Sequence, residues 1–157
     1  MPAVGLGIMR AVPSVFVVFA LAIASPAFAD DSIAGTYDVK FDEAGSTCSP
    51  KPETFSKGKV AITIKKAALT VKFDGLYQMV GTTPKNGDLK AKTTMLVGTA
   101  VGGLSARYSV AGRVDGGTLA LVLTAVYVRQ DTKKPYCTQA WNVSGPRIAG
   151  TPDKKTK

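Results

Sequence analysis

The chain has 157 residues, of which 20 are Lys or Arg and 11 are Asp or Glu, so its formal net charge at neutral pH is +9. This length suits a single domain with a substantial core. The chain contains no histidine, which removes the usual general base and the commonest metal ligand, and it shows no zinc-type spacing. We therefore expect no metal, no cofactor and no enzymatic activity.

The N-terminal segment has the features of a secretory signal. Arg10 supplies a positive charge, an apolar run follows over residues 11–24, and Ala27 and Ala29 form a small-residue cleavage sequence. The run is too short to span a membrane comfortably, which disfavours a membrane anchor as the alternative. The sequence predicts a cleaved signal peptide over residues 1–29, a periplasmic or secreted destination, and no transmembrane segment after cleavage.

Residues 30–148 alternate between apolar and polar side chains with a period of two, which predicts one all-β domain. In the first strand, for example, Tyr37 and Val39 fall on one face while Asp38 and Lys40 fall on the other. Turn-forming residues separate about eight such segments. The expected strands cover residues 33–42, 55–65, 69–73, 76–82, 89–97, 104–113, 118–129 and 136–144.

One of these segments, residues 118–129, is apolar on both faces. Leu121 and Leu123 lie on one side, and Val122, Val126 and Val128 lie on the other. Either another part of the protein covers the second face, or that face contacts a partner. Beyond the last strand, residues 149–157 form a polar and basic tail that we expect to be disordered.

The two cysteines, Cys48 and Cys137, are expected to form one disulfide in an oxidising compartment; two free buried thiols are the alternative. Cys48 follows the first strand and Cys137 lies in the last, so a disulfide would bring the two ends of the domain together. Closure of a barrel does the same and removes exposed sheet edges. The sequence thus predicts an eight-stranded antiparallel up-and-down barrel, with a β-sandwich as the alternative.

Lysines are concentrated in the second to fifth expected strands, on their polar faces. Such a basic face attracts anionic membrane surfaces or acidic proteins; lysines on strands also prevent edge-to-edge aggregation, and this simpler role carries equal weight. Nucleic-acid binding is disfavoured because no aromatic residues alternate with these lysines. The residues of this basic face are Lys57, Lys59, Lys65, Lys66, Lys72, Lys90 and Lys92.

Several aromatic residues fall on the inward faces of the expected strands. Inside a barrel of eight strands they either fill the core or line a cavity for one small ligand. The candidates for such a cavity are Tyr37, Phe73, Tyr108, Tyr127 and Trp141.

Gly35-Thr36-Tyr37 opens the first strand and Arg147 follows the last. This arrangement resembles the calycin group of avidins and lipocalins, in which a G-x-W motif begins the first strand and a basic residue covers its ring. Tyr37 stands where that group has tryptophan. The resemblance implies a small ligand-binding or inhibitor barrel.

The sequence therefore favours an exported, non-enzymatic barrel that binds a small apolar or amphipathic ligand. The alternative is an envelope interaction protein or inhibitor that acts through its basic face or through the second apolar face of residues 118–129.

Overall fold

The computed structural model describes residues 33–82 and 87–148, so the expected signal peptide and basic tail lie outside the described residues. Strands dominate this part of the chain and it contains no α-helix, which confirms the all-β prediction. The strands are β1 (Gly35–Ser46), β2 (Lys57–Lys65), β3 (Ala68–Phe73), β4 (Met79–Thr82), β5 (Asp88–Lys92), β6 (Val97–Gly98), β7 (Leu104–Asp115), β8 (Thr118–Arg129) and β9 (Pro135–Pro146).

Every pairing between neighbouring strands is antiparallel, and the hydrogen bonds run around one sheet. Its order is β5-β4-β3-β2-β1-β9-β8-β7-β6, and an additional ladder joins β5 to β7. This ladder closes β1–β5 and β7–β9 into a ring. The up-and-down order predicted from the sequence is therefore present, with one short extra strand.

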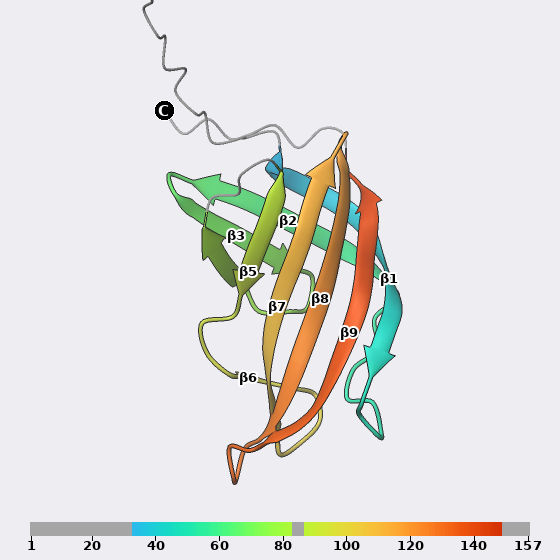
Figure 1. The fold of residues 1–157 in the computed structure, drawn as a ribbon, viewed down its shortest axis with the longest axis vertical. Helices are drawn as coiled ribbons and strands as arrows, with labels where there is room; N and C mark the ends of the chain where they lie inside the picture. The colour runs from blue at the N-terminus through green and yellow to red at the C-terminus, as the bar shows by residue number, and fades with distance from the viewer. Residues whose placement is uncertain (1–32, 83–86, 149–157) are drawn as a thin grey trace, which may run out of the picture.

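The ring is not a regular barrel. The ladder between β7 and β8 extends over the whole of both strands, whereas β4 and β5 share only two residue pairs. Figure 1 shows β5, β7, β8 and β9 as one layer, with β2 and β3 crossing behind it. Because one continuous sheet forms both layers, the structure favours a flattened barrel over a sandwich of two separate sheets.

The expected strand at residues 89–97 is interrupted. β5 and β6 lie end to end along the same edge of β7, with residues 93–96 between them outside the regular ladder. At the break, the side-chain Oγ1 of Thr93 accepts the backbone N–H of Tyr108 at 3.2 Å, in the place of a backbone carbonyl. A hydroxyl that bonds to the backbone in this way competes with the ladder, so the strand ends there.

The first strand is longer than predicted. It continues past Asp42 to Ser46, with a bulge between Glu43 and Gly45 where it pairs with β9. Turn-forming residues at 43–46 suggested a loop, but pairing with the long β9 strand keeps this segment extended. A bulge also bends the strand locally, at the end where β1 leads into the disulfide.

The core fills the space inside the ring with side chains from alternate strand positions. In β8 the buried residues are Leu119, Leu121, Leu123, Ala125 and Tyr127. Equivalent alternation in β1, β2, β3 and β9 adds further apolar side chains to the same continuous cluster. The inward positions follow the period-two pattern because successive side chains on a strand point to opposite faces.

The disulfide prediction is confirmed. Cys48 and Cys137 are bonded, and their Cα atoms lie 5.0 Å apart. β1 pairs with β9, so the first and last strands are neighbours, as barrel closure requires. A disulfide is compatible with an oxidising, exported location.

Candidate functional site

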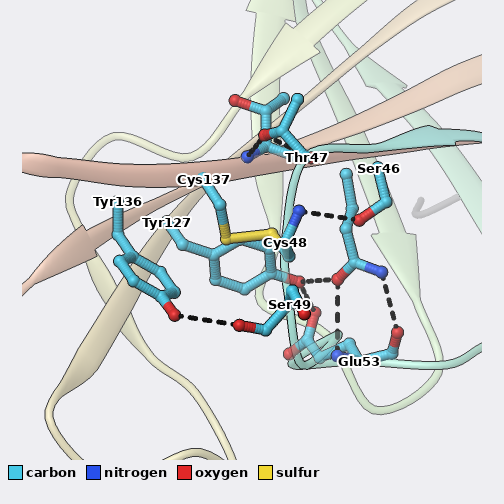
Figure 2. The surroundings of a disulfide bond; sticks show 10 residues. Ser46, Thr47, Cys48, Ser49, Glu53, Tyr127, Tyr136 and Cys137 are labelled. Atoms are coloured by element: carbon cyan, nitrogen blue, oxygen red, sulfur yellow. Dashed lines mark hydrogen bonds between the residues drawn. A yellow bond between two sulfur atoms is a disulfide. The ribbon is translucent and has the colours of Figure 1, made fainter.

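One end of the barrel is crossed by residues 47–56, the connection between β1 and β2, which we call the strap. The disulfide ties the strap to β9, and Thr47 adds a backbone hydrogen bond from its N–H to the carbonyl of Thr138 at 2.9 Å. Farther along the strap, the Phe55 ring packs edge-on against Trp141, with ring centres 4.9 Å apart. Covalent, polar and aromatic contacts thus hold the strap to the sheet. Figure 2 shows the disulfide and the polar contacts around it.

Glu53 of the strap enters the end of the barrel and accepts hydrogen bonds from two tyrosines. The hydroxyl of Tyr108 donates to its carboxylate at 2.7 Å, and the hydroxyl of Tyr127 donates to it at 2.9 Å. Gln139 binds the strap backbone on the same side, since its Nε2 donates to the carbonyl of Glu53 at 3.1 Å. β7, β8 and β9 therefore each contribute one polar side chain to a single cluster. Figure 2 shows Glu53 and Tyr127 of this cluster beside the disulfide.

The two tyrosines in this cluster hold their protons tightly. Burial raises the pKa of Tyr108 most, and the hydrogen bond and negative charge of Glu53 raise it further. Burial also raises the pKa of Tyr127, followed by the charge and hydrogen bond of Glu53. Ionisation of either hydroxyl would place a second negative charge beside the carboxylate. The cluster is therefore suited to closing the barrel end, and its tyrosines are poor candidates for proton acceptors.

An open hollow of about 540 Å³ lies at this end of the barrel; we call it the mouth hollow. Pro50 and Pro52 of the strap form one side. Val101 lies in the turn before β7 and Leu104 is the first residue of β7. Arg129 ends β8, and Tyr136 lies at the start of β9. The guanidinium of Arg129 lies 5.2 Å from the centre of the Tyr136 ring. The lining is thus largely apolar, with a small number of polar groups at its border.

The opposite end of the barrel contains the residues on which the calycin resemblance rests. The guanidinium carbon of Arg147 lies 5.5 Å from the centre of the Tyr37 ring, and its Nη2 donates to the Tyr37 hydroxyl at 2.9 Å. A side chain at Gly35 would crowd Arg147, because an added Cβ would lie 3.3 Å from the arginine Cδ. The structure therefore brings together Gly35, Tyr37 and Arg147, the three residues on which the resemblance rests.

The five cavity candidates are all buried in the core. Tyr37, Phe73, Tyr108, Tyr127 and Trp141 are each at most 1% exposed. None of them lines the hollows found on the described residues at the mouth, on the outside of β4, β5, β7 and β8, or beside β1 and β9. They pack and hydrogen-bond with other protein groups, so their role in a ligand cavity stays a prediction.

The side chains of the expected basic face are all exposed, but they are divided between two parts of the sheet. Lys57, Lys59, Lys65 and Lys72 belong to β2 and β3, with Lys66 in the turn between them. Lys90 and Lys92 belong to β5. The uncharged outward residues of β4 separate these two lysines from the first group.

The second face of β8 is partly open to solvent. Val122 is 43% exposed and Val126 is 37% exposed, so nothing in the described part of the chain covers this face completely. Val128 is half-buried. A partner surface on this face stays a prediction.

The sequence did not predict the polar cluster at the barrel end. Glu53 falls between the expected strands at residues 33–42 and 55–65, where a charged residue is ordinary. The available signal was Gln139, a polar residue on the inward face of the last strand. An inward polar side chain requires a hydrogen-bond partner when it is buried, and here the strap and Tyr127 supply it.

In residues 33–82 and 87–148, no helix is long and apolar enough to cross a membrane. The same residues contain no cluster of three or more histidine, cysteine or acidic side chains arranged to hold a metal ion. Comparison of the chain with protein-family models, curated proteins and solved structures gives no match. The resemblance to calycins therefore rests on the residues described above and stays a prediction.

Proposed function

We propose that this protein is an exported, non-enzymatic binding protein whose mouth hollow takes a small apolar or amphipathic ligand. The observation that carries this proposal is the hollow of about 540 Å³ between the strap and two neighbouring connections. Its volume lies within the range of about 300–1,000 Å³ typical of small-molecule sites. The signal-like N-terminus and the disulfide support a periplasmic or secreted location.

The ligand is expected to sit at the mouth, since aromatic and aliphatic side chains occupy the interior. Prolines and Tyr136 give the hollow rigid, apolar walls. Arg129 supplies a positive charge and Asp131 a negative one at its border, so the lining has no net preference for an anionic ligand. Apolar contact, with one or two polar contacts for orientation, is the recognition that this lining supports.

Native mass spectrometry of the protein purified from its own host tests this proposal, followed by titration with the neutral fluorophore N-phenyl-1-naphthylamine. We expect a co-purifying small molecule and saturable binding of the fluorophore. Gly102→Trp should weaken the binding of the co-purifying molecule and of the fluorophore. Gly102 lines the hollow and has open space where a side chain would be, so a tryptophan there would fill the hollow. The expected loss of affinity is about tenfold or more.

Gly98→Trp is the matched control, because Gly98 also has open space around it but does not line the mouth hollow. Its affinity for the fluorophore should stay within about twofold of the original. Absence of any co-purifying molecule together with equal fluorophore binding by both variants would contradict a ligand site at the mouth.

A further inference from the structure

A second hollow, of about 560 Å³, lies on the outer surface of the barrel, where β4, β5, β7 and β8 are adjacent. We call it the outer hollow. It shares no lining residue with the mouth hollow. These strands, apart from β4, face the viewer in Figure 1. This region contains the ladder between β5 and β7 that closes the ring.

Strand register explains the shape of the outer hollow. Lys90 of β5 lies opposite Ala111 of β7, and Ala111 lies opposite Val122 of β8. Two residues farther along β5, on the same face as Lys90, Lys92 lies opposite Ser109 of β7. The β7 side chains between the lysines and β8 are therefore short, which leaves a recess with a low, uncharged floor.

The charge at the outer hollow is entirely positive. Lys90 and Lys92 are the charged residues of its lining, and both are exposed. The ion pairs found on the described residues involve Lys40, Lys51 and Arg113 as their cations, so neither lysine of the hollow takes part in one. Asp88, the acidic residue of the same strand, lies 3.9 Å from Arg113 instead.

The two lysines also point in the same direction. Residues two apart on a strand share a face and are separated by roughly 7 Å along it. Flexible lysine side chains at that spacing can place two ammonium groups around one anionic group, and their alkyl stems add apolar contact. On the far side of the recess, Val122 offers an exposed apolar surface.

We propose that the outer hollow binds a single-chain anionic amphiphile. Lys90 and Lys92 bind its carboxylate or phosphate head, and its alkyl chain lies across Ala111 and Ser109 against Val122. The recess favours one chain over a bilayer surface, because its uncharged floor of short side chains lies below the longer lysine side chains, where a flat membrane would not reach it.

Titration of the full, disulfide-bonded protein with monomeric dodecyl phosphate at low salt, followed by amide chemical shifts in NMR spectra, tests this inference. The largest shifts should come from β5 and from the facing parts of β7 and β8. Lys90→Gln/Lys92→Gln should weaken binding by about tenfold or more, and added salt should weaken binding to the original protein. Ala111→Trp, which fills the exposed floor, should abolish it.

Two controls separate this site from general charge and from the mouth hollow. Lys57→Gln/Lys59→Gln removes two exposed lysines outside the hollow and should change the affinity by less than about twofold. The uncharged dodecyl maltoside should bind about tenfold more weakly than the phosphate. Equal losses in both lysine pairs, shifts centred on the mouth hollow, or binding to anionic vesicles without binding of the monomer would each overturn the proposal.

Discussion

Glu53 joins three strands of the barrel to the strap through its carboxylate and its backbone. The hydroxyls of Tyr108 and Tyr127 donate to the carboxylate, and Gln139 contacts the backbone. All three partners are buried, and every buried side-chain polar atom in the described part of the chain has a hydrogen-bond partner. Because an unpaired buried polar group costs about 1–3 kcal/mol, the strap and the barrel interior depend on each other for stability.

We expect the free energy of unfolding to fall as the pH rises above about 10. In the unfolded chain both tyrosines ionise near their ordinary pKa of 10.0, whereas the folded pKa of each is raised well above it. Above that pH the unfolded state therefore binds fewer protons than the folded state. The stabilisation is complete below the unfolded pKa and is lost as the pH rises toward the folded values.

Urea denaturation between about pH 8 and 11 measures this dependence, whose slope is at most about 1.4 kcal/mol per pH unit for each tyrosine. Tyr108→Phe and Tyr127→Phe should each remove one tyrosine's share of the slope. Tyr136→Phe is the control, because the Tyr136 hydroxyl is exposed and bonds to a backbone carbonyl. An unchanged slope in both interior variants would show that these hydroxyls ionise equally in the folded and unfolded states.

The contact between β4 and β5 is the shortest ladder in the ring. It consists of the pairs Val80↔Lys92 and Gly81↔Ala91. The two strands approach so closely at Gly81 that a Cβ there would collide with the backbone carbonyl of Lys90. Absence of a side chain thus permits the approach, which is a common reason for glycine in a strand interior.

Gly81→Ala should destabilise the protein by more than about 2 kcal/mol, since the colliding group is backbone and cannot rotate away. Gly98→Ala is the matched control within a strand: open space surrounds an added Cβ there. Reduced freedom of the unfolded chain would then make its effect neutral or slightly stabilising. Midpoints of chemical denaturation give both values, and similar midpoints for the two variants would contradict this account of the β4–β5 contact.

Closure of the ring gives each of its strands a hydrogen-bonded neighbour on both sides. Exposed strand edges promote aggregation, and a closed ring removes them. The disulfide reinforces closure by joining residues 89 positions apart. The chain-entropy model assigns a loop of that length a stabilisation of about 4–5 kcal/mol, obtained by restricting the unfolded chain.

Amide hydrogen exchange tests the closure directly. β5 pairs with both β4 and β7, whereas β6 pairs with β7 alone. We therefore expect the amides of Leu89 and Ala91, which point toward β7, to exchange at least about tenfold more slowly than those of Val97 and Gly98. Exchange of β5 as fast as that of β6 would show that the ring opens readily at the β5–β7 ladder.

The sequence also predicted much of the local structure correctly. The long strand at residues 118–129 has the predicted bounds. Of its two apolar faces, one is buried and the other is partly exposed. A turn was expected between the strands at residues 104–113 and 118–129, and Gly116 and Gly117, both with positive φ, join β7 to β8 there. Such features depend on neighbouring residues, so a single sequence contains the information needed to predict them.

The sites were less predictable, because they consist of residues brought together from distant parts of the chain. Glu53 and Tyr108 lie 55 positions apart, and neither shows by its neighbours that it contacts the other. The lysines of the outer hollow were assigned to one continuous basic face, since the sequence could not show how β4 separates them from β2 and β3.

Alternation of apolar and polar residues by itself determined that this chain forms strands with one inward face, because side chains on a strand point alternately to opposite sides. Only the tertiary structure decided the register and extent of each ladder, the place where β5 closes the ring on β7, and which loop crosses the barrel end. Those outcomes depend on register and packing between distant segments, whose free energies arise only when the whole chain is assembled.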